Sequence, residues 1–204
     1  MLHWDKYFGY GSGSDEKHTD SPHKSEKKSN MFVLLLPWIV FWVAVSIESY
    51  AGALISVSGC AAASIIFFRN RKTPYDVISH SAVIILSVLV LWSGNTSVIL
   101  PVSYLIFGLM WCISCFTKIP LTAHYSMNDY GKDKALENPL FLRTNLILTL
   151  AWGILYIATS IWTFFLIASP AAPYIAIINN ICPVVMDVFT AWFQRWYPPH
   201  YASK

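Results

Sequence analysis

A 38-residue apolar run, residues 31–68, constrains the fold of this chain more than any other feature. It contains one formally charged side chain, Glu48, near its middle. As a single helix the run would be about 57 Å long, roughly twice the hydrocarbon thickness of a bilayer. The run must therefore fold back on itself, and the polar segment 46–50 is where it can turn. This pattern predicts a hairpin of two membrane-crossing helices, at about 31–47 and 51–68.

The second arm of this hairpin carries a small residue at every fourth position. Residues four apart lie on the same face of a helix, and small side chains there let two helix backbones approach closely. We expect this ridge to be the packing centre of the molecule. Its members are Gly52, Ser56, Cys60 and Ser64.

The composition places the whole chain in the same class as this hairpin. The 204 residues are 55% hydrophobic and 12% charged, whereas soluble domains carry about 25% charged residues. Four further apolar runs follow, so we expect an all-α polytopic membrane protein whose residues 31–194 form a six-helix transmembrane bundle. The four runs cover about 77–92, 98–116, 139–168 and 174–192.

Three polar segments lie outside the expected spans. Residues 1–30 read as a disordered cytoplasmic tail, because after an aromatic start they contain nothing that could build a core. Residues 117–138 are expected to form a cytoplasmic loop, which ends where Asn138 and Pro139 have the residue types of a helix cap and first helical residue. Residues 195–204 are expected to form a cytoplasmic C-terminal tail.

The distribution of basic residues predicts the orientation. All 14 Lys and Arg side chains lie in the N-terminal tail, in the loops after the second and fourth spans, or at the C-terminal end. The three remaining turns contain none, so the positive-inside rule places both termini in the cytoplasm. The basic residues expected to anchor helix ends at the inner interface are Arg69, Arg71, Lys72, Arg143 and Arg195.

Five polar residues in or near the spans are candidates for function. Glu48 is either a turn residue at the outer interface or a functional group in an outward-facing pocket. Asp76, His80 and Asp187 lie toward the cytoplasmic side, where they form either an ion-paired belt with the basic residues or a polar pocket or proton path. Asn179 is expected to bridge helices by hydrogen bonds.

Cys112 and Cys115 form a CxxC pair, which can be a redox centre. The expected topology places them near the cytoplasmic side, where thiols stay reduced, so we interpret them as small structural residues. A membrane thiol oxidoreductase is the alternative. The sequence has no phosphate-binding loop, compact metal-ligand spacing or nucleophile elbow, and it therefore predicts no cofactor and no enzyme. The net charge of +3 is too small to favour nucleic acid as a partner.

A series of short motifs occurs in a recognisable order along residues 31–198. They are Leu36-Pro37-Trp38-Ile39-Val40-Phe41, Tyr50-Ala51-Gly52-Ala53, the basic break Arg69–Lys72, Lys118-Ile119-Pro120-Leu121, Arg143-Thr144-Asn145-Leu146, Ala151-Trp152-Gly153 and Arg195-Trp196-Tyr197-Pro198. This order resembles the intracellular septation protein family (the septation protein A type of bacterial inner-membrane protein) and related uncharacterised membrane proteins. The polar tail and the charged loop lean toward the uncharacterised relatives.

The resemblance implies a bacterial inner-membrane protein that supports septation or envelope integrity, with no catalytic residues. We therefore expect a non-enzymatic protein that contacts lipid and other inner-membrane proteins, through loop 117–144 and the basic tail, and that can form homo-oligomers. The alternative is a small-solute or proton-linked transporter that uses Glu48, His80 and Asp187 as path residues.

Overall fold

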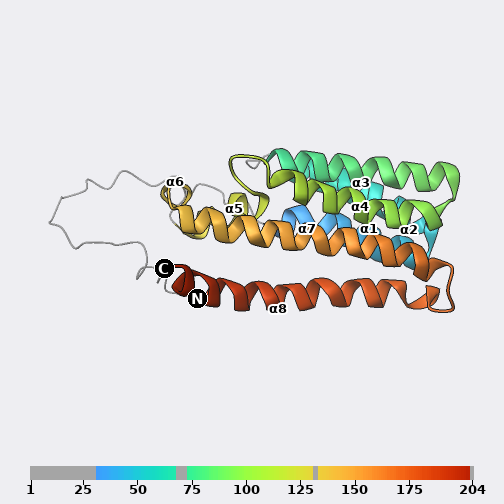
Figure 1. Cartoon of the computed structure of the whole chain (residues 1–204). Coiled ribbons are helices and arrows are strands. Elements are labelled where there is room, and N and C mark those ends of the chain that lie inside the picture. The colour runs from blue at the N-terminus through green and yellow to red at the C-terminus, as the bar shows by residue number, and fades with distance from the viewer. Residues whose placement is uncertain (1–30, 68–72, 131–132, 203–204) are drawn as a thin grey trace.

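The computed structural model describes residues 31–67, 73–130 and 133–202, and within these ranges the protein is entirely helical. Six helices are long and run roughly parallel or antiparallel to one another (Figure 1). They are α1 (Met31–Ile47), α2 (Ser49–Phe67), α3 (Pro74–Ser93), α4 (Thr96–Ser114), α7 (Pro139–Ile167) and α8 (Ile175–Ala202). The short elements are α5 (Leu121–Ser126), η2 (Met127–Asp129), α6 (Asp133–Leu136) and η3 (Ala172–Tyr174).

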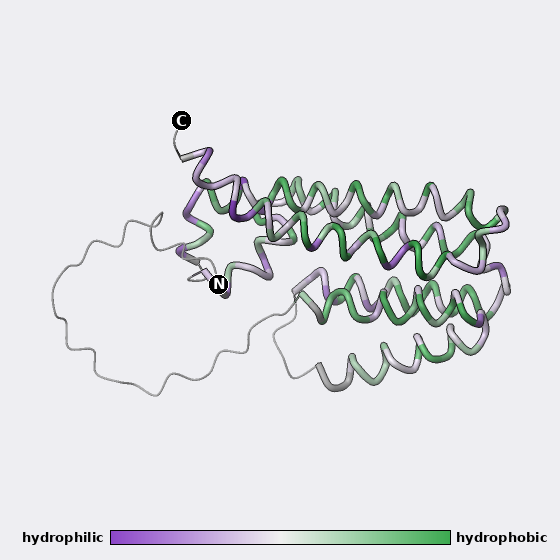
Figure 2. Tube along the Cα trace, turned by 90° about the horizontal axis from the view of Figure 1, so that it is seen from below, coloured by the Kyte–Doolittle hydropathy of each residue, from purple (hydrophilic) through white to green (hydrophobic). Residues whose placement is uncertain are grey.

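Four helical segments of the described chain are long and apolar enough to cross a membrane. They are α3, α4, α7 and the segment Ala172–Tyr201, which contains all of α8 except its last residue. A shorter apolar helix covers Val33–Ile47. Hydrophobic residues predominate along the lengths of the long helices (Figure 2). The protein is therefore an all-helical bundle with the features of a membrane protein.

The two ends of the bundle differ. One end contains the starts of α1, α3 and α7 and the ends of α4 and α8 (Figure 1). The short helices α5 and α6 also lie there. We call it the α5 end. At the opposite end, which we call the turn end, short connections join α1 to α2, α3 to α4 and α7 to α8.

Local sequence signals account for where these helices start and stop. Thr73 caps α3 in a reciprocal capping box with Asp76, and Pro74 fills the first turn, where no amide hydrogen is required. The helix ends at Gly94, whose φ of 64° is favourable for glycine alone. The Asn138 side chain accepts hydrogen bonds from two amides of the first turn of α7, which confirms the cap expected there.

The most extensive helix–helix contact joins α4 to α7. A methyl group added at Gly108 of α4 would lie 2.9 Å from the carbonyl oxygen of Gly153 in α7. One added at Gly153 would lie 2.5 Å from Cys112 Sγ. The contact therefore depends on the absence of side chains at both glycines, and it is more extensive than the contact between α1 and α2 alone.

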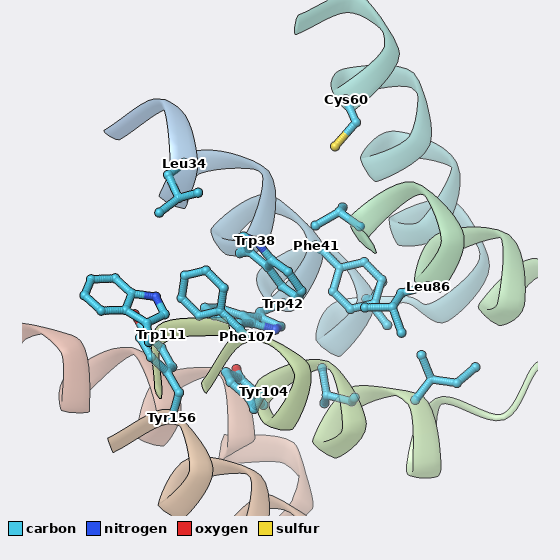
Figure 3. Close-up of a cluster of buried hydrophobic side chains, with 14 of the residues drawn as sticks. Leu34, Trp38, Phe41, Trp42, Cys60, Leu86, Tyr104, Phe107, Trp111 and Tyr156 are labelled. Atoms are coloured by element: carbon cyan, nitrogen blue, oxygen red, sulfur yellow. The ribbon is translucent and has the colours of Figure 1, made fainter. Parts of the chain in front are cut away.

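Aromatic rings fill the centre of the bundle (Figure 3). Trp38 and Trp42 of α1 contact Phe107 of α4 at centroid distances of 4.8 and 5.4 Å. Trp42 also contacts Tyr156 of α7 at 5.5 Å. The indole nitrogen of Trp42 donates a hydrogen bond of 2.9 Å to Ser103 Oγ, so this polar atom is satisfied inside the core. The rings link α1, α4 and α7 into one packed unit.

Two segments differ from the sequence-based expectation. Helix α8 continues to Ala202, well beyond the end at about residue 192 that was expected for the sixth run, so residues 195–202 of the expected C-terminal tail are helical. Stacked rings along its last turns, including Trp196 against His200 at 4.7 Å, support this extension. The expected loop 117–138 contains α5, η2 and α6, because α5 buries apolar and hydroxyl side chains against α7. The N-terminal tail expected over 1–30 lies outside the described residues.

Candidate functional site

The densest polar cluster joins the first turn of α3 to α5. Asp76 is only 7% exposed. Its Oδ1 accepts a hydrogen bond of 2.7 Å from the Tyr125 hydroxyl. Its Oδ2 accepts bonds of 2.9 Å from both the amide and the hydroxyl of Thr73. The carboxylate is thus held by three donors and fastens α5 to the start of α3.

His80 lies one helical turn beyond Asp76 and is 9% exposed. Its Nδ1 is 2.8 Å from the backbone oxygen of Asp76, while its Nε2 is buried and has no hydrogen-bond partner. The two side chains expected to form a pocket or proton path are therefore neighbours, but the imidazole contacts the backbone of Asp76 and not its carboxylate.

His124 of α5 completes the ionisable groups of this junction. Its ring lies 5.6 Å from that of Tyr75, edge to face. Burial lowers the pKa of His124, and the Asp76 carboxylate opposes this effect in part. Burial is also the main cause that raises the pKa of the Tyr125 phenol, so at neutral pH this hydroxyl keeps the proton that it donates to Asp76.

A second polar network fastens α5 to α7. The Thr122 hydroxyl donates a bond of 2.7 Å to the backbone oxygen of Asn145 and lies 2.7 Å from Thr149 Oγ1. Ser126 donates to the side-chain oxygen of Asn145 at 3.0 Å. The short helix is therefore tied to two spans by buried hydrogen bonds.

Asn179 bridges helices, as its sequence position predicted. Its amide nitrogen donates to Thr163 Oγ1 at 2.8 Å, and its oxygen accepts from the indole of Trp162 at the same distance. Both partners lie on α7, so Asn179 joins α8 to α7 near the turn end. Farther along, the Trp152 indole donates to Thr190 of α8 at 3.1 Å.

Asp187 lies in the middle part of α8 and is exposed. It forms no hydrogen bond or ion pair with any described residue, and it does not meet Asp76 or His80. Asn180 and Gln194 lie seven residues before and after it, which places the three polar side chains on one line along the helix. We call these three residues the polar line of α8.

Glu48 lies at the turn end and is exposed. Its carboxylate accepts hydrogen bonds from the amides of Tyr50, at 3.1 Å, and Ala51. It therefore caps the first turn of α2, where a carboxylate also interacts favourably with the helix dipole. Neither His80 nor Asp187 lies beside it, so the three expected path residues are not brought together.

The small-residue ridge of α2 lies partly against α1. A methyl group at Gly52 would clash with the backbone of Ala44 and Val45. Ser56 and Cys60 are buried, and the Ser56 hydroxyl donates to the backbone oxygen of Gly52 at 2.8 Å. Ser64, the last member of the ridge, is half-buried.

Of the expected anchors, Arg143 and Arg195 are described, and Arg69, Arg71 and Lys72 lie outside the described residues. Arg143 donates a hydrogen bond of 2.8 Å to the Tyr201 hydroxyl, and its guanidinium lies 4.7 Å from the centre of that ring. It thereby ties the start of α7 to the end of α8. Arg195 is exposed.

Cys112 and Cys115 are both half-buried free thiols. Cys112 packs against Gly153, and Cys115 lies 3.7 Å from the backbone oxygen of Trp111. Both positions suit the structural role expected for them. No group of three or more His, Cys, Asp or Glu side chains that could hold a metal occurs in the described part of the chain.

Sequence reasoning missed the residues through which α5 is buried. Tyr125, Thr122 and Asn145 are ordinary loop or span residues in the sequence, and their partners lie 19 to 49 positions away. The only sequence signal for α5 was the apolar Leu121, which follows a proline and precedes small residues. This signal is weak. The chain matches no protein-family model, no curated protein and no solved structure.

Proposed function

We propose that this protein is a six-span protein of the bacterial cytoplasmic membrane, with both termini in the cytoplasm, that acts by binding another membrane protein through the polar line of α8. In this arrangement α1 and α2 form the first hairpin and complete the bundle. The distribution of basic residues supports the orientation. The resemblance to the septation protein A type supports the choice of membrane.

The observation that carries the proposal is the position of Asp187. This carboxylate is exposed near the middle of the 30-residue segment Ala172–Tyr201. Placing an unpaired aspartate at the centre of a span costs about 3 kcal/mol on insertion scales. Charged residues in spans therefore normally face a partner, and within the described part of the chain Asp187 has no hydrogen-bond or ion-pair partner.

The surroundings of Asp187 support a helix as the partner. Asn180 and Gln194 extend the polar line over two heptads, about 21 Å, which is the length of contact between two packed helices. Asn180 donates to its own backbone at Ala176, and this leaves its side-chain oxygen available to a partner. A helix with a lysine, arginine or other donor at the depth of Asp187 would satisfy this line.

The packed centre supports binding rather than transport. A route along the bundle axis would have to displace Trp38, Trp42 and Phe107, which contact one another and are at most 4% exposed. The side chains that a route would need lie in separate places: Glu48 at the turn end, His80 toward the α5 end, and Asp187 exposed in the middle part of α8.

Site-specific photocrosslinking in cells tests the proposal. A photoreactive residue replaces Ala191, which is exposed and one turn from Asp187 on α8. We expect a protein adduct of one defined mass, identified by mass spectrometry, and its loss when Asp187→Leu is added. The matched control replaces Val185, which is exposed but lies about 200° from Asp187 around the helix.

Two outcomes would contradict the proposal: lipid adducts alone at both positions, or a protein adduct that is unaffected by Asp187→Leu. Division or envelope-synthesis proteins in the adduct would assign the function implied by the family resemblance. An adduct with a second copy of this chain would make the polar line a homo-oligomer interface.

A further inference from the structure

Three buried side-chain polar atoms of the described residues have no hydrogen-bond partner: Ser46 Oγ, His80 Nε2 and Trp111 Nε1. Ser46 lies near the end of α1, at the turn end. The other two lie toward the α5 end, and their side chains are 9% and 0% exposed. Buried polar groups are nearly always paired, so two orphaned atoms at one end of the bundle indicate a site.

The unpaired atom of His80 is a hydrogen-bond acceptor. Its Nδ1 faces the backbone oxygen of Asp76, which can only accept, so Nδ1 carries the hydrogen. In the neutral ring Nε2 therefore has a free lone pair. It lies on the opposite side of the ring from Nδ1 and points away from the helix backbone.

The unpaired atom of Trp111 is a donor, because an indole nitrogen can only donate. The ring is held in place by Phe107 at 6.0 Å and Tyr156 at 6.4 Å (Figure 3). Trp152 also contacts it at 5.7 Å. The two orphaned atoms thus have complementary chemistry.

Both residues lie toward the α5 end of their helices, His80 near the start of α3 and Trp111 near the end of α4. Helices α3 and α4 are antiparallel, and the Tyr75 and Thr117 hydroxyls meet at 3.3 Å. His80 lies five residues beyond Tyr75 on α3, about 8 Å, and Trp111 lies three residues before the end of α4 at Ser114, about 5 Å.

Helix α5 closes the bundle one turn below each of them. Asp76, one turn before His80, is bonded to Tyr125. Ser114, one turn after Trp111, accepts a bond of 3.3 Å from the amide of Leu121. Helix α5 is therefore the floor beneath His80 and Trp111.

We propose that this end of the bundle binds one small neutral hydroxyl compound between α3 and α4, above α5. Its hydroxyl donates to His80 Nε2 and accepts from the indole hydrogen of Trp111. Water is the smallest compound of this class, and a small alcohol-bearing solute is the other source of the same group. A metal ion fits less well, because the indole is not a ligand and no metal-binding cluster occurs in the described chain.

Nuclear magnetic resonance of the full-length protein in nanodiscs tests the site. The protein carries ¹⁵N in its histidine and tryptophan rings, and the two signals are assigned by their loss in His80→Gln and Trp111→Phe. We expect His80 Nε2 to show the shift of an acceptor nitrogen that receives a hydrogen bond, and the Trp111 indole proton to be shifted as a bonded donor. Each signal should move when the other residue is replaced.

Trp162→Phe is the control, because the Trp162 indole bonds to Asn179 near the turn end and should leave His80 unchanged. A bare or protonated Nε2 would overturn the proposal, as would two signals that respond independently to the substitutions. The same sample shows whether the bound hydroxyl group belongs to water or to a solute. A magnetisation-transfer signal from bulk water at the indole proton identifies water. If the indole proton is hydrogen-bonded but receives no magnetisation from water, and a hydroxyl compound is extracted from the protein, the bound compound is a solute.

Discussion

At the scale of single residues, two glycines of α2 have different surroundings, and substitutions there distinguish an effect on packing from an effect on helix propensity. Gly52 faces the backbone of Ala44, whereas a methyl group at Gly59 would meet nothing within 4 Å. We predict that Gly52→Ala lowers the free energy of unfolding by about 1–3 kcal/mol, through overpacking between α1 and α2. Gly59→Ala should be neutral or stabilise the protein by up to about 1 kcal/mol, because alanine favours the helix. Unfolding in mixed micelles measures both, and equal effects would contradict the packing role.

The buried carboxylate of Asp76 gives a second residue-scale prediction. Tyr125→Phe removes the hydroxyl that donates to Oδ1 and should destabilise the protein by about 1.5–3 kcal/mol, since the bond is to a charged group. Tyr50→Phe is the control, because Tyr50 is 60% exposed at the turn end. Thermal unfolding of the two variants tests the difference. A Tyr125→Phe variant as stable as the control would show that Thr73 alone suffices to hold Asp76.

Individual residues also show which contacts could be predicted from the sequence and which could not. The cap at Asn138 depends on neighbouring residues and was predictable. A turn position was one of two alternatives for Glu48, and its role as the cap of α2 was not predicted, because the hydrogen bonds depend on where the turn begins. The pairing of Gly108 with Gly153 joins positions 45 residues apart, and no periodicity in one sequence reveals such a pair.

At the scale of elements, the docking of α5 should depend on pH through His124. Burial lowers the pKa of this side chain in the folded protein, so the unfolded chain binds the proton more readily. The stability contributed by neutral His124 is complete above the ordinary histidine pKa of about 6.5 and is lost as the pH falls below it. We predict that unfolding temperatures drop between about pH 7.5 and 5.5, and drop less in His124→Gln.

Other groups titrate over the same pH range, so the relevant quantity is the difference in unfolding temperature between the unsubstituted protein and the His124→Gln variant. Hydrogen exchange of the α5 amides provides the local readout. Protection factors, which correct for the slower intrinsic exchange at low pH, should fall at the lower pH only in the unsubstituted protein. Identical pH profiles for both proteins would show that His124 does not control the docking of α5.

The elements also show which sequence signals were strong. Five of the six long helices begin and end within a few residues of the expected apolar runs, because a long apolar run leaves few alternatives to a helix. Helix α8 is the exception, since it extends beyond its run. The sequence did not predict α5, whose six residues are too few for a periodicity and whose stability comes from partners on α3 and α7. The extension of α8 through Pro198 and Pro199 was missed because proline normally ends a helix.

At the scale of the whole molecule, the proposed orientation makes a prediction about the two faces of the membrane. Alkaline phosphatase fused after Gly94 or Ala171, at the turn end, should be active outside the cytoplasm. Fluorescent protein fused at Lys134 or after the C-terminus should fold inside. The opposite pattern at any one site would break the six-span arrangement, because every span alternates direction with its neighbours.

The burial of α5 has a consequence for the order of events during synthesis. Its partners are Asp76, made earlier, and Asn145 and Thr149, made later. A growing chain that has released α5 but not yet inserted α7 leaves Leu121 and Tyr125 without their buried surroundings. Closure of this end must therefore wait for the fifth long helix, and a ribosome that stalls before residue 149 leaves behind a bundle that is open on one side.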